Sequence, residues 1–253
     1  MDRSGKNWQR DESIVAFNLY CKTPFGRIHN TNPDVIRIAE KIGRSASALE
    51  MKMLNFAHFD PELRNRNVSG LAHVGKTDKQ IWDEFNEDWE KLAVESEEAL
   101  ARLEGESAES AMETEITGPT AKEQVVKTRL VQRFFRASVL SSYNFACCFC
   151  GLGVAGLLNA SHIVPWAVRE QGRADPRNGL CLCALHDRAF DRGMMAVDEE
   201  LRIILAGGLK RQKGCKVLDV AFVELEGVSI SPPERFLPEA KALAYHRENI
   251  FEG

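Results

Sequence analysis

The chain has 253 residues, with a hydrophobic fraction of 44% and a charged fraction of 28%. This length and composition are typical of one or two globular domains, and they exclude a chain that is disordered throughout. No apolar run reaches the roughly 18–20 residues of a transmembrane helix, and the first residues lack the apolar core of a secretory signal. The chain has seven cysteines, an odd number, which does not favour a framework of disulfide pairs. We therefore expect a cytoplasmic protein without membrane contact, whose cysteines bind metal or lie buried as thiols.

The net charge of −4 is unevenly distributed along the chain. Residues 1–70 carry a formal charge of +3, residues 71–120 carry −10, and residues 121–253 carry +3. Because one acidic stretch holds the whole negative excess, the total charge does not exclude a polyanionic partner. We expect a helical domain over 1–95, an acidic linker over 96–120 and a second domain over 121–253.

The first domain is predicted to be helical. A mostly apolar helix covers Ser13 to Cys21, and Asn32-Pro33 is a start signal for a second helix that ends at Gly43. Ser47 and Glu50 have the spacing of a capping box that opens a third helix. The domain closes with a single amphipathic helix, whose apolar residues are Ile81, Trp82, Phe85, Trp89 and Leu92.

Two short helices joined by a glycine turn are similar to a helix-turn-helix, in which the second helix contacts DNA. The candidate DNA-binding residues here are Arg44 in the turn and Lys52 and Asn55 on the third helix. The alternative is a helical bundle in which Gly43 only ends a helix. A further basic helix opens the second domain, and its Lys127 and Arg133 either contact phosphates or form a solvated face.

The stretch from Cys147 to Gly193 is the most informative part of the chain. A short strand ends at His162, and Asn178 lies in a loop before a second apolar strand. A helix follows from Ala184 to Arg192, where Gly193 ends it. The predicted order is strand, loop, strand, helix. After it we expect a hairpin over 195–205, a strand over 216–223 and a terminal helix over 238–251.

These residues resemble the HNH nuclease family, whose active site is a ββα-metal unit. His162, Asn178 and His186 follow the order of the family's three letters. Ser-His-Ile-Val-Pro-Trp and Phe-Asp-Arg-Gly are similar to a bacterial subgroup linked to restriction, and the resemblance extends over about the last half of the chain. It implies an α+β protein in which a helical domain selects DNA and an HNH domain cuts it.

The resemblance also implies residue roles. His162 is expected to act as the general base and Asn178 to orient the loop around it. Asp187 is expected to bind one divalent ion per active site, with Asp191 one helical turn further on as a second ligand. Oxygen ligands suit Mg²⁺ or Mn²⁺. Ser161 stands where the family often has a stronger ligand, and its hydroxyl would bind the ion weakly or through water.

Several residues keep more than one interpretation. His186 could bind the catalytic ion, bind zinc, position phosphate or pack in the helix, and Asp191 could instead pair with Arg192 or cap the helix. A Cys-x-x-Cys and a Cys-x-x-His pair have the spacing of a structural zinc site. The alternative is a set of small buried thiols. The candidate zinc ligands are Cys147, Cys150, Cys183 and His186.

The sequence therefore predicts a metal-dependent DNA endonuclease used in restriction or another defence, and a requirement for modified cytosine is one specificity that the resemblance allows. A homodimer is expected because two strands need two active sites. The alternative is a non-catalytic DNA-binding regulator with a zinc-stabilised ββα scaffold. A nuclease acting on RNA or single strands is a third hypothesis, since the phosphate chemistry is the same.

Overall fold

The structure of the protein is a computed structural model that describes residues 3, 5–66, 75–104, 119–169, 171–212 and 214–253. The chain divides into two compact units, each described by itself below. Unit 1 consists of residues 1–138 and 172–175, and unit 2 consists of residues 139–171 and 176–253. No helix in the described part of the chain is long and apolar enough to cross a bilayer.

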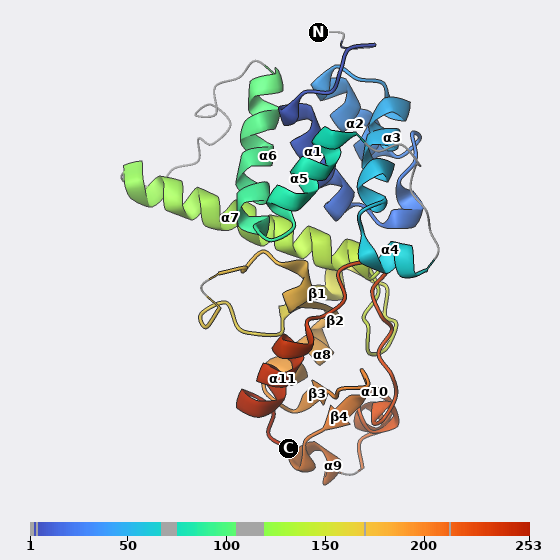
Figure 1. Ribbon diagram of the computed structural model, residues 1–253. Coiled ribbons are helices and arrows are strands. Elements are labelled where there is room, and N and C mark those ends of the chain that lie inside the picture. Colours follow the sequence, from blue (N-terminus) through green and yellow to red (C-terminus); the bar gives the residue numbers. More distant parts are fainter. Residues whose placement is uncertain (1–2, 4, 67–74, 105–118, 170, 213) are drawn as a thin grey trace. The chain divides into compact units, whose positions relative to one another are not determined.

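Unit 1 is built from helices (Figure 1). The ring of Phe17 on α1 lies 4.7 Å from that of Phe56 and 5.3 Å from that of Trp82, measured between centroids. These rings are buried, and they form the core on which α1 packs against α3, α5 and α6. The helices are α1 (Arg10–Lys22), α2 (Pro33–Ile42), α3 (Ala46–Ala57), α4 (Pro61–Asn65), α5 (Lys76–Phe85), α6 (Trp89–Glu104) and most of α7 (Pro119–Ser142).

The start of α2 confirms the sequence prediction, and the start of α3 does not. The Asn32 side chain accepts a hydrogen bond from the N–H of Asp34, and Gly43 follows α2 with a φ of 70°. The N-cap of α3 is Ser45, whose hydroxyl accepts from the N–H of Ala48, so the capping box predicted at Ser47 is wrong. The Ser47 hydroxyl instead accepts from the side chain of Asn30.

The single helix predicted from Ile81 to Leu92 is also wrong, because the helix is interrupted between Phe85 and Trp89 and forms two helices, α5 and α6. The Asp88 carboxylate accepts a hydrogen bond from the N–H of Lys91 at 3.0 Å and so caps a new helix. Ile81, Phe85, Trp89 and Leu92 are nevertheless buried, as the periodicity predicts. Since α6 runs to Glu104, residues 96–104 of the expected linker are helical, and residues 105–118 lie outside the described part of the chain.

Unit 2 combines short helices with two small antiparallel sheets (Figure 1). A mostly helical chain with such sheets is compatible with the α+β class. The division between the units falls inside α7, after residue 138, whereas the expected boundary was residue 121. The elements after α7 are β1 (Leu158–His162), β2 (Gly179–Cys183), α8 (Ala184–Asp191), β3 (Met195–Val197), β4 (Ile203–Leu205), α9 (Gly207–Lys210), α10 (Lys216–Ala221) and α11 (Ala240–Asn249).

The hairpin predicted over 195–205 is confirmed by the pairing of β3 with β4. The terminal helix is confirmed as α11, which packs on β3. The strand predicted over 216–223 is wrong, since this segment forms α10 and a following 3-10 turn. The β-branched valines of this segment favour a strand locally, but all three are exposed, and no strand in the described part of the chain pairs with them: Val217, Val220 and Val223.

The C-terminal segment fixes the end of α8. The His246 ring stacks on Phe190 at 3.7 Å, and its Nε2–H donates to the Phe190 carbonyl at 3.1 Å. Gly193 follows α8 with a φ of 66°, and a Cβ at this position would lie 2.0 Å from the carbonyl oxygen of Ile250. The N–H of Glu252 donates to the Gly193 carbonyl. Only glycine fits between the helix end and this segment.

Candidate functional site

The predicted order of strand, loop, strand and helix is present as β1, β2 and α8. The two strands pair antiparallel, with Leu158 opposite Cys183 and His162 opposite Gly179. His162 therefore ends β1 at the point where β2 begins. The helix follows β2 directly, because Cys183 is both the last residue of the strand and the N-cap of α8.

Asn178 ties down the loop that follows His162. Its side-chain oxygen accepts from the N–H of Val164 at 2.9 Å, and its amide donates to the Val164 carbonyl at 3.0 Å. Its own carbonyl accepts from the N–H of Ile163. Because Asn178 is fully buried, these three bonds fix the backbone after His162. The His162 ring is half-buried and meets the ring of Trp166 edge-on, 5.7 Å between centroids.

Asp187 and Asp191 lie one turn apart on α8. Asp187 is half-buried, and its Oδ2 accepts a hydrogen bond from the amide of Asn159 on β1 at 2.7 Å. Asp191 is exposed, yet desolvation by its surroundings, followed by the negative charge of Asp187, raises the pKa of its carboxyl. Two like charges held together on one face are stabilised by a cation, which is the property of a metal site.

Ser161 lies on β1 near this carboxylate pair. It is 3% exposed, and its hydroxyl makes no hydrogen bond of standard geometry. The same hydroxyl nevertheless opposes the increase in the pKa of Asp191, so it lies close to that carboxyl. A buried hydroxyl whose hydrogen bond has poor geometry costs free energy, and a bound ion or its water would reduce that cost. The residues present thus fit a divalent ion.

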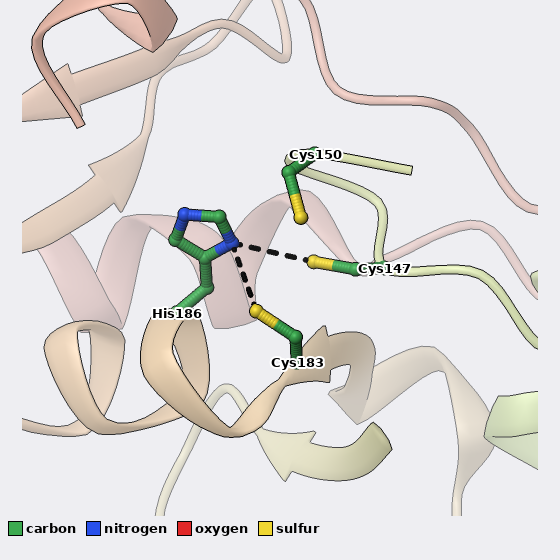
Figure 2. A group of neighbouring side chains, drawn as sticks. All are labelled: Cys147, Cys150, Cys183 and His186. Carbon is green, nitrogen blue, oxygen red and sulfur yellow. Dashed lines mark hydrogen bonds between the residues drawn. The ribbon is translucent and has the colours of Figure 1, made fainter. Parts of the chain in front are cut away.

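A second cluster lies on another face of α8, where the side chains of Cys147, Cys150, Cys183 and His186 converge (Figure 2). Among the described residues, one ligand atom from each lies within 4.8 Å of the others. His186 Nδ1 is 3.4 Å from the Cys147 sulfur and 3.3 Å from the Cys183 sulfur. A tetrahedral zinc site requires ligand separations of about 3.5–3.8 Å, so the four residues fit zinc with little movement.

The histidine tautomer also suits a metal. His186 Nε2 is 2.7 Å from the carbonyl oxygen of Ala221. Because a carbonyl only accepts, Nε2 must carry the proton, which leaves the lone pair of Nδ1 directed at the sulfurs. The ring of Phe222 packs edge-on against the same imidazole. Of the roles that the sequence left open for His186, this geometry favours zinc, because the buried ring is engaged within the cysteine cluster.

The turn that carries two of the cysteines is closed by the backbone. The N–H of Gly151 donates to the Cys147 carbonyl, and the N–H of Cys147 donates to the Leu152 carbonyl. The N–H of Cys148 then joins the turn to the Cys181 carbonyl on β2. This network holds Cys147 and Cys150 on the same side of the turn, opposite Cys183.

The candidate DNA-binding residues fall into two groups. Arg44 and Lys52 are buried, and their charged atoms lie 2.8 Å from Glu12 and 2.6 Å from Asp78 respectively. The Asn55 amide donates to the same Asp78. These three side chains are thus engaged in internal contacts, whereas a side chain that contacts bases must be accessible at the surface. Lys127 and Arg133 differ, because both are exposed on α7.

The structure also indicates residues that the sequence did not single out. One of them is Asn159, which contacts Asp187. The sequence contained a signal for this residue, because residues two apart on a strand share a face and Asn159 stands two before Ser161. Arg188 and Arg192 line a hollow of about 270 Å³ beside α8. The remaining residues around that hollow are Leu185, Ala189, Met194 and Phe222. The contact between Ala221 and His186 had no sequence signal, because a backbone carbonyl carries none.

A model of the HNH endonuclease family matches residues 147–198. The match covers β1, β2 and α8, together with the cysteine turn before them and the hairpin strand β3 after them. It supports the assignment of this segment to the HNH superfamily of nucleases. No curated protein matches the chain.

Proposed function

We propose that the protein is a divalent-metal-dependent endonuclease that hydrolyses phosphodiester bonds in DNA. The observation that carries the proposal is the ββα segment itself: an Asn-fixed loop after His162 lies beside a helix with two adjacent carboxylates, in a segment that matches the HNH endonuclease family. A scaffold without activity has no need to hold two carboxylates of the same charge on one helix face.

His162 would accept a proton from the attacking water, since a neutral imidazole can act as a base near neutral pH. Asn178 would keep the His162 backbone in place while the proton moves. Asp187, Asp191 and the Ser161 hydroxyl would hold a Mg²⁺ or Mn²⁺ ion. When bound, such an ion stabilises the negative charge that develops on the phosphate and on the leaving oxygen. The expected products carry a 5′-phosphate and a 3′-hydroxyl.

DNA is proposed as the substrate because the family cuts DNA and because exposed basic side chains are present in the chain. Arg188 lies on α8 next to Asp187 in sequence, and Arg192 directly follows that helix. With Lys127 and Arg133 on α7, they are the residues that we expect to contact phosphates. A role in restriction or defence, a requirement for modified cytosine, a homodimer and a cytoplasmic location are kept as further proposals.

The test is a plasmid cleavage assay with Mg²⁺ or Mn²⁺. It compares unmodified DNA with DNA that carries modified cytosine, and wild type with His162→Ala. Loss of a general base should lower the rate by about 10²–10⁴-fold. His29→Ala is the matched control, because His29 is an exposed histidine outside the ββα segment. Equal cutting by both histidine variants would contradict the proposed base.

The second candidate function is a DNA-binding regulator, favoured by the four zinc-type ligands around His186. It predicts tight DNA binding without Mg²⁺ and no cutting of either plasmid or of single-stranded DNA or RNA. Cutting of the single-stranded substrates alone would keep the nuclease and change its substrate.

A further inference from the structure

Two rows of side chains face each other between β1 and α8. Side chains alternate along a strand, so Asn159 and Ser161 point to the same face of β1. Their spacing is about 6.6–6.8 Å. Asp187 and Asp191 lie four residues apart on α8, which is a rise of about 6 Å. Because the spacings match, each strand residue meets one carboxylate: Asn159 contacts Asp187, and Ser161 lies near Asp191.

The contact with Asn159 is the better defined of the two. Its Nδ2 donates to Asp187 Oδ2 at 2.7 Å, between groups that are half-buried. A hydrogen bond to one carboxylate oxygen restricts rotation of the carboxyl group, and it leaves the other oxygen, Oδ1, available to a ligand. The bond joins two elements that are 28 residues apart in sequence, so it also sets the position of the carboxylate relative to β1.

The donor is an amide rather than a cation, and this difference matters for a metal site. A Lys or Arg at position 159 would neutralise Asp187 and compete with a divalent ion for it. A neutral amide orients the carboxylate and leaves the full charge of the pair in place. Residues that hold metal ligands by hydrogen bonds in this way contribute to metal affinity without touching the ion.

We propose that Asn159 is a positioning residue that fixes the Asp187 carboxylate for binding of a divalent cation. The inference rests on the proposed function, since it requires Asp187 to be a metal ligand. Loss of such a hydrogen bond reduces metal affinity by about 10–100-fold. The ion still binds at high concentration, because both carboxylates remain. The effect should therefore appear in the metal dependence of the reaction and not in its maximal rate.

The test uses the full chain with one equivalent of Zn²⁺ added, so that the cysteine cluster does not compete for the second metal. Asn159→Leu removes the amide and keeps the size of the side chain. Asn249→Leu is the matched control, because its amide donates to the Tyr245 carbonyl on α11. Asp187→Asn is the reference for loss of the site. The readouts are Mn²⁺ binding, followed by the electron paramagnetic resonance of the free ion, the rate of DNA cleavage against Mg²⁺ concentration, and the unfolding temperature.

For Asn159→Leu we expect the Mn²⁺ dissociation constant and the Mg²⁺ concentration at half-maximal rate to rise by about 10–100-fold. The rate at saturating Mg²⁺ should return close to that of wild type, and Asn249→Leu should leave both constants unchanged. A residue with a merely structural role would lower the unfolding temperature and the active fraction without moving either constant, and that result would overturn the proposal.

The Asp187→Asn variant separates the metal site itself from the positioning role of Asn159. If Asp187→Asn loses Mn²⁺ and Asn159→Leu does not, the positioning role is wrong and the nuclease proposal stands. If Asp187→Asn binds Mn²⁺ as wild type does, both the metal site and the inference built on it are wrong.

Discussion

The two units arrange their charged and metal-binding groups in opposite ways. In unit 1, buried charges meet opposite charges: Arg44 pairs with Glu12, and Lys52 pairs with Asp78. In unit 2, groups of the same kind are brought together instead. Three cysteines and a histidine converge on one another, and two carboxylates share a helix face. Such arrangements are costly alone, and they become favourable when a cation is added.

Unit 2 also keeps its two clusters on different faces of α8. The cysteine cluster supplies four ligands, which is the closed set of a structural zinc site. In the proposed metal site, two carboxylates and one hydroxyl would bind the ion, and such an incomplete set would leave positions for water and substrate. Unit 1 uses buried charge for stability, and we propose that unit 2 uses its carboxylates and thiols to bind ions. The predictions below test this contrast, from the largest expected effect to the smallest.

We propose that the cysteine cluster binds structural zinc, so removal of zinc should unfold unit 2 and leave unit 1 folded. Structural zinc sites contribute about 10 kcal/mol or more of apparent binding free energy, which is comparable with the whole stability of a small domain. A chelator, or Cys183→Ser, should therefore abolish the amide exchange protection of residues 147–198 while the helices α1 to α6 stay protected. The measurement is hydrogen exchange resolved by segment.

The control for this experiment is Cys215→Ser, since Cys215 is an exposed cysteine outside the cluster. It should change neither protection nor zinc content. Full protection of 147–198 in the metal-free protein would mean that the thiols act only as buried side chains.

Asp78→Ala should destabilise unit 1 by about 3–5 kcal/mol, because it leaves the Lys52 ammonium buried without its carboxylate. The double variant Lys52→Met, Asp78→Leu should recover most of this loss, since a buried ion pair is often replaceable by apolar residues. Chemical denaturation of the three proteins measures both effects.

The same double variant tests the predicted DNA contact of Lys52. If the charge pair only stabilises unit 1, DNA affinity in the double variant should equal that of wild type. A selective loss of DNA binding in the stable double variant would show that Lys52 leaves its partner to contact DNA, and the contrast between the units would fail.

The stability of unit 2 should fall as the pH drops from about 6.5 to about 4. Burial lowers the pKa of His246 from 6.5 to about 4, so in this range the unfolded chain binds a proton that the folded chain does not. The full shift corresponds to at most about 3 kcal/mol, lost across the window and constant below it. His246→Gln, which keeps an N–H donor for the Phe190 carbonyl, should remove this part of the pH dependence. An unchanged slope in denaturation curves of the variant between pH 4 and 6.5 would assign the loss to other groups.

The ββα unit could be predicted from the sequence because its signals are local. Pro165 ends a strand, Gly193 ends a helix, and the residues between them fall in a fixed order that resembles a known family. The four zinc-type ligands were predicted for the same reason, since two short spacings indicate them. What the sequence could not decide was which role His186 takes, because this depends on the Ala221 carbonyl, 35 residues away.

The errors have physical causes of two kinds. Between α5 and α6, the apolar periodicity continues across the interruption of the helix. An Asp such as Asp88 can cap a new helix or lie on the exposed face of a continuous one, so the sequence does not distinguish the two. In α10, the valines favour a strand, but no strand among the described residues pairs with them, and the helix end places Ala221 against His186. Lys52 faces inward because of Asp78, a residue on a different helix, and no pattern within α3 indicates that partner.

The edge-on contact between Trp166 and His162 provides an optical probe. The other three tryptophans, Trp8, Trp82 and Trp89, all belong to unit 1. Replacing those three by phenylalanine would leave Trp166 as the sole indole of the chain. Because a protonated imidazole quenches the emission of an indole that it touches, the fluorescence of such a protein would report the protonation of His162 directly. The ionisation of the expected base could then be followed by light alone, with no substrate present.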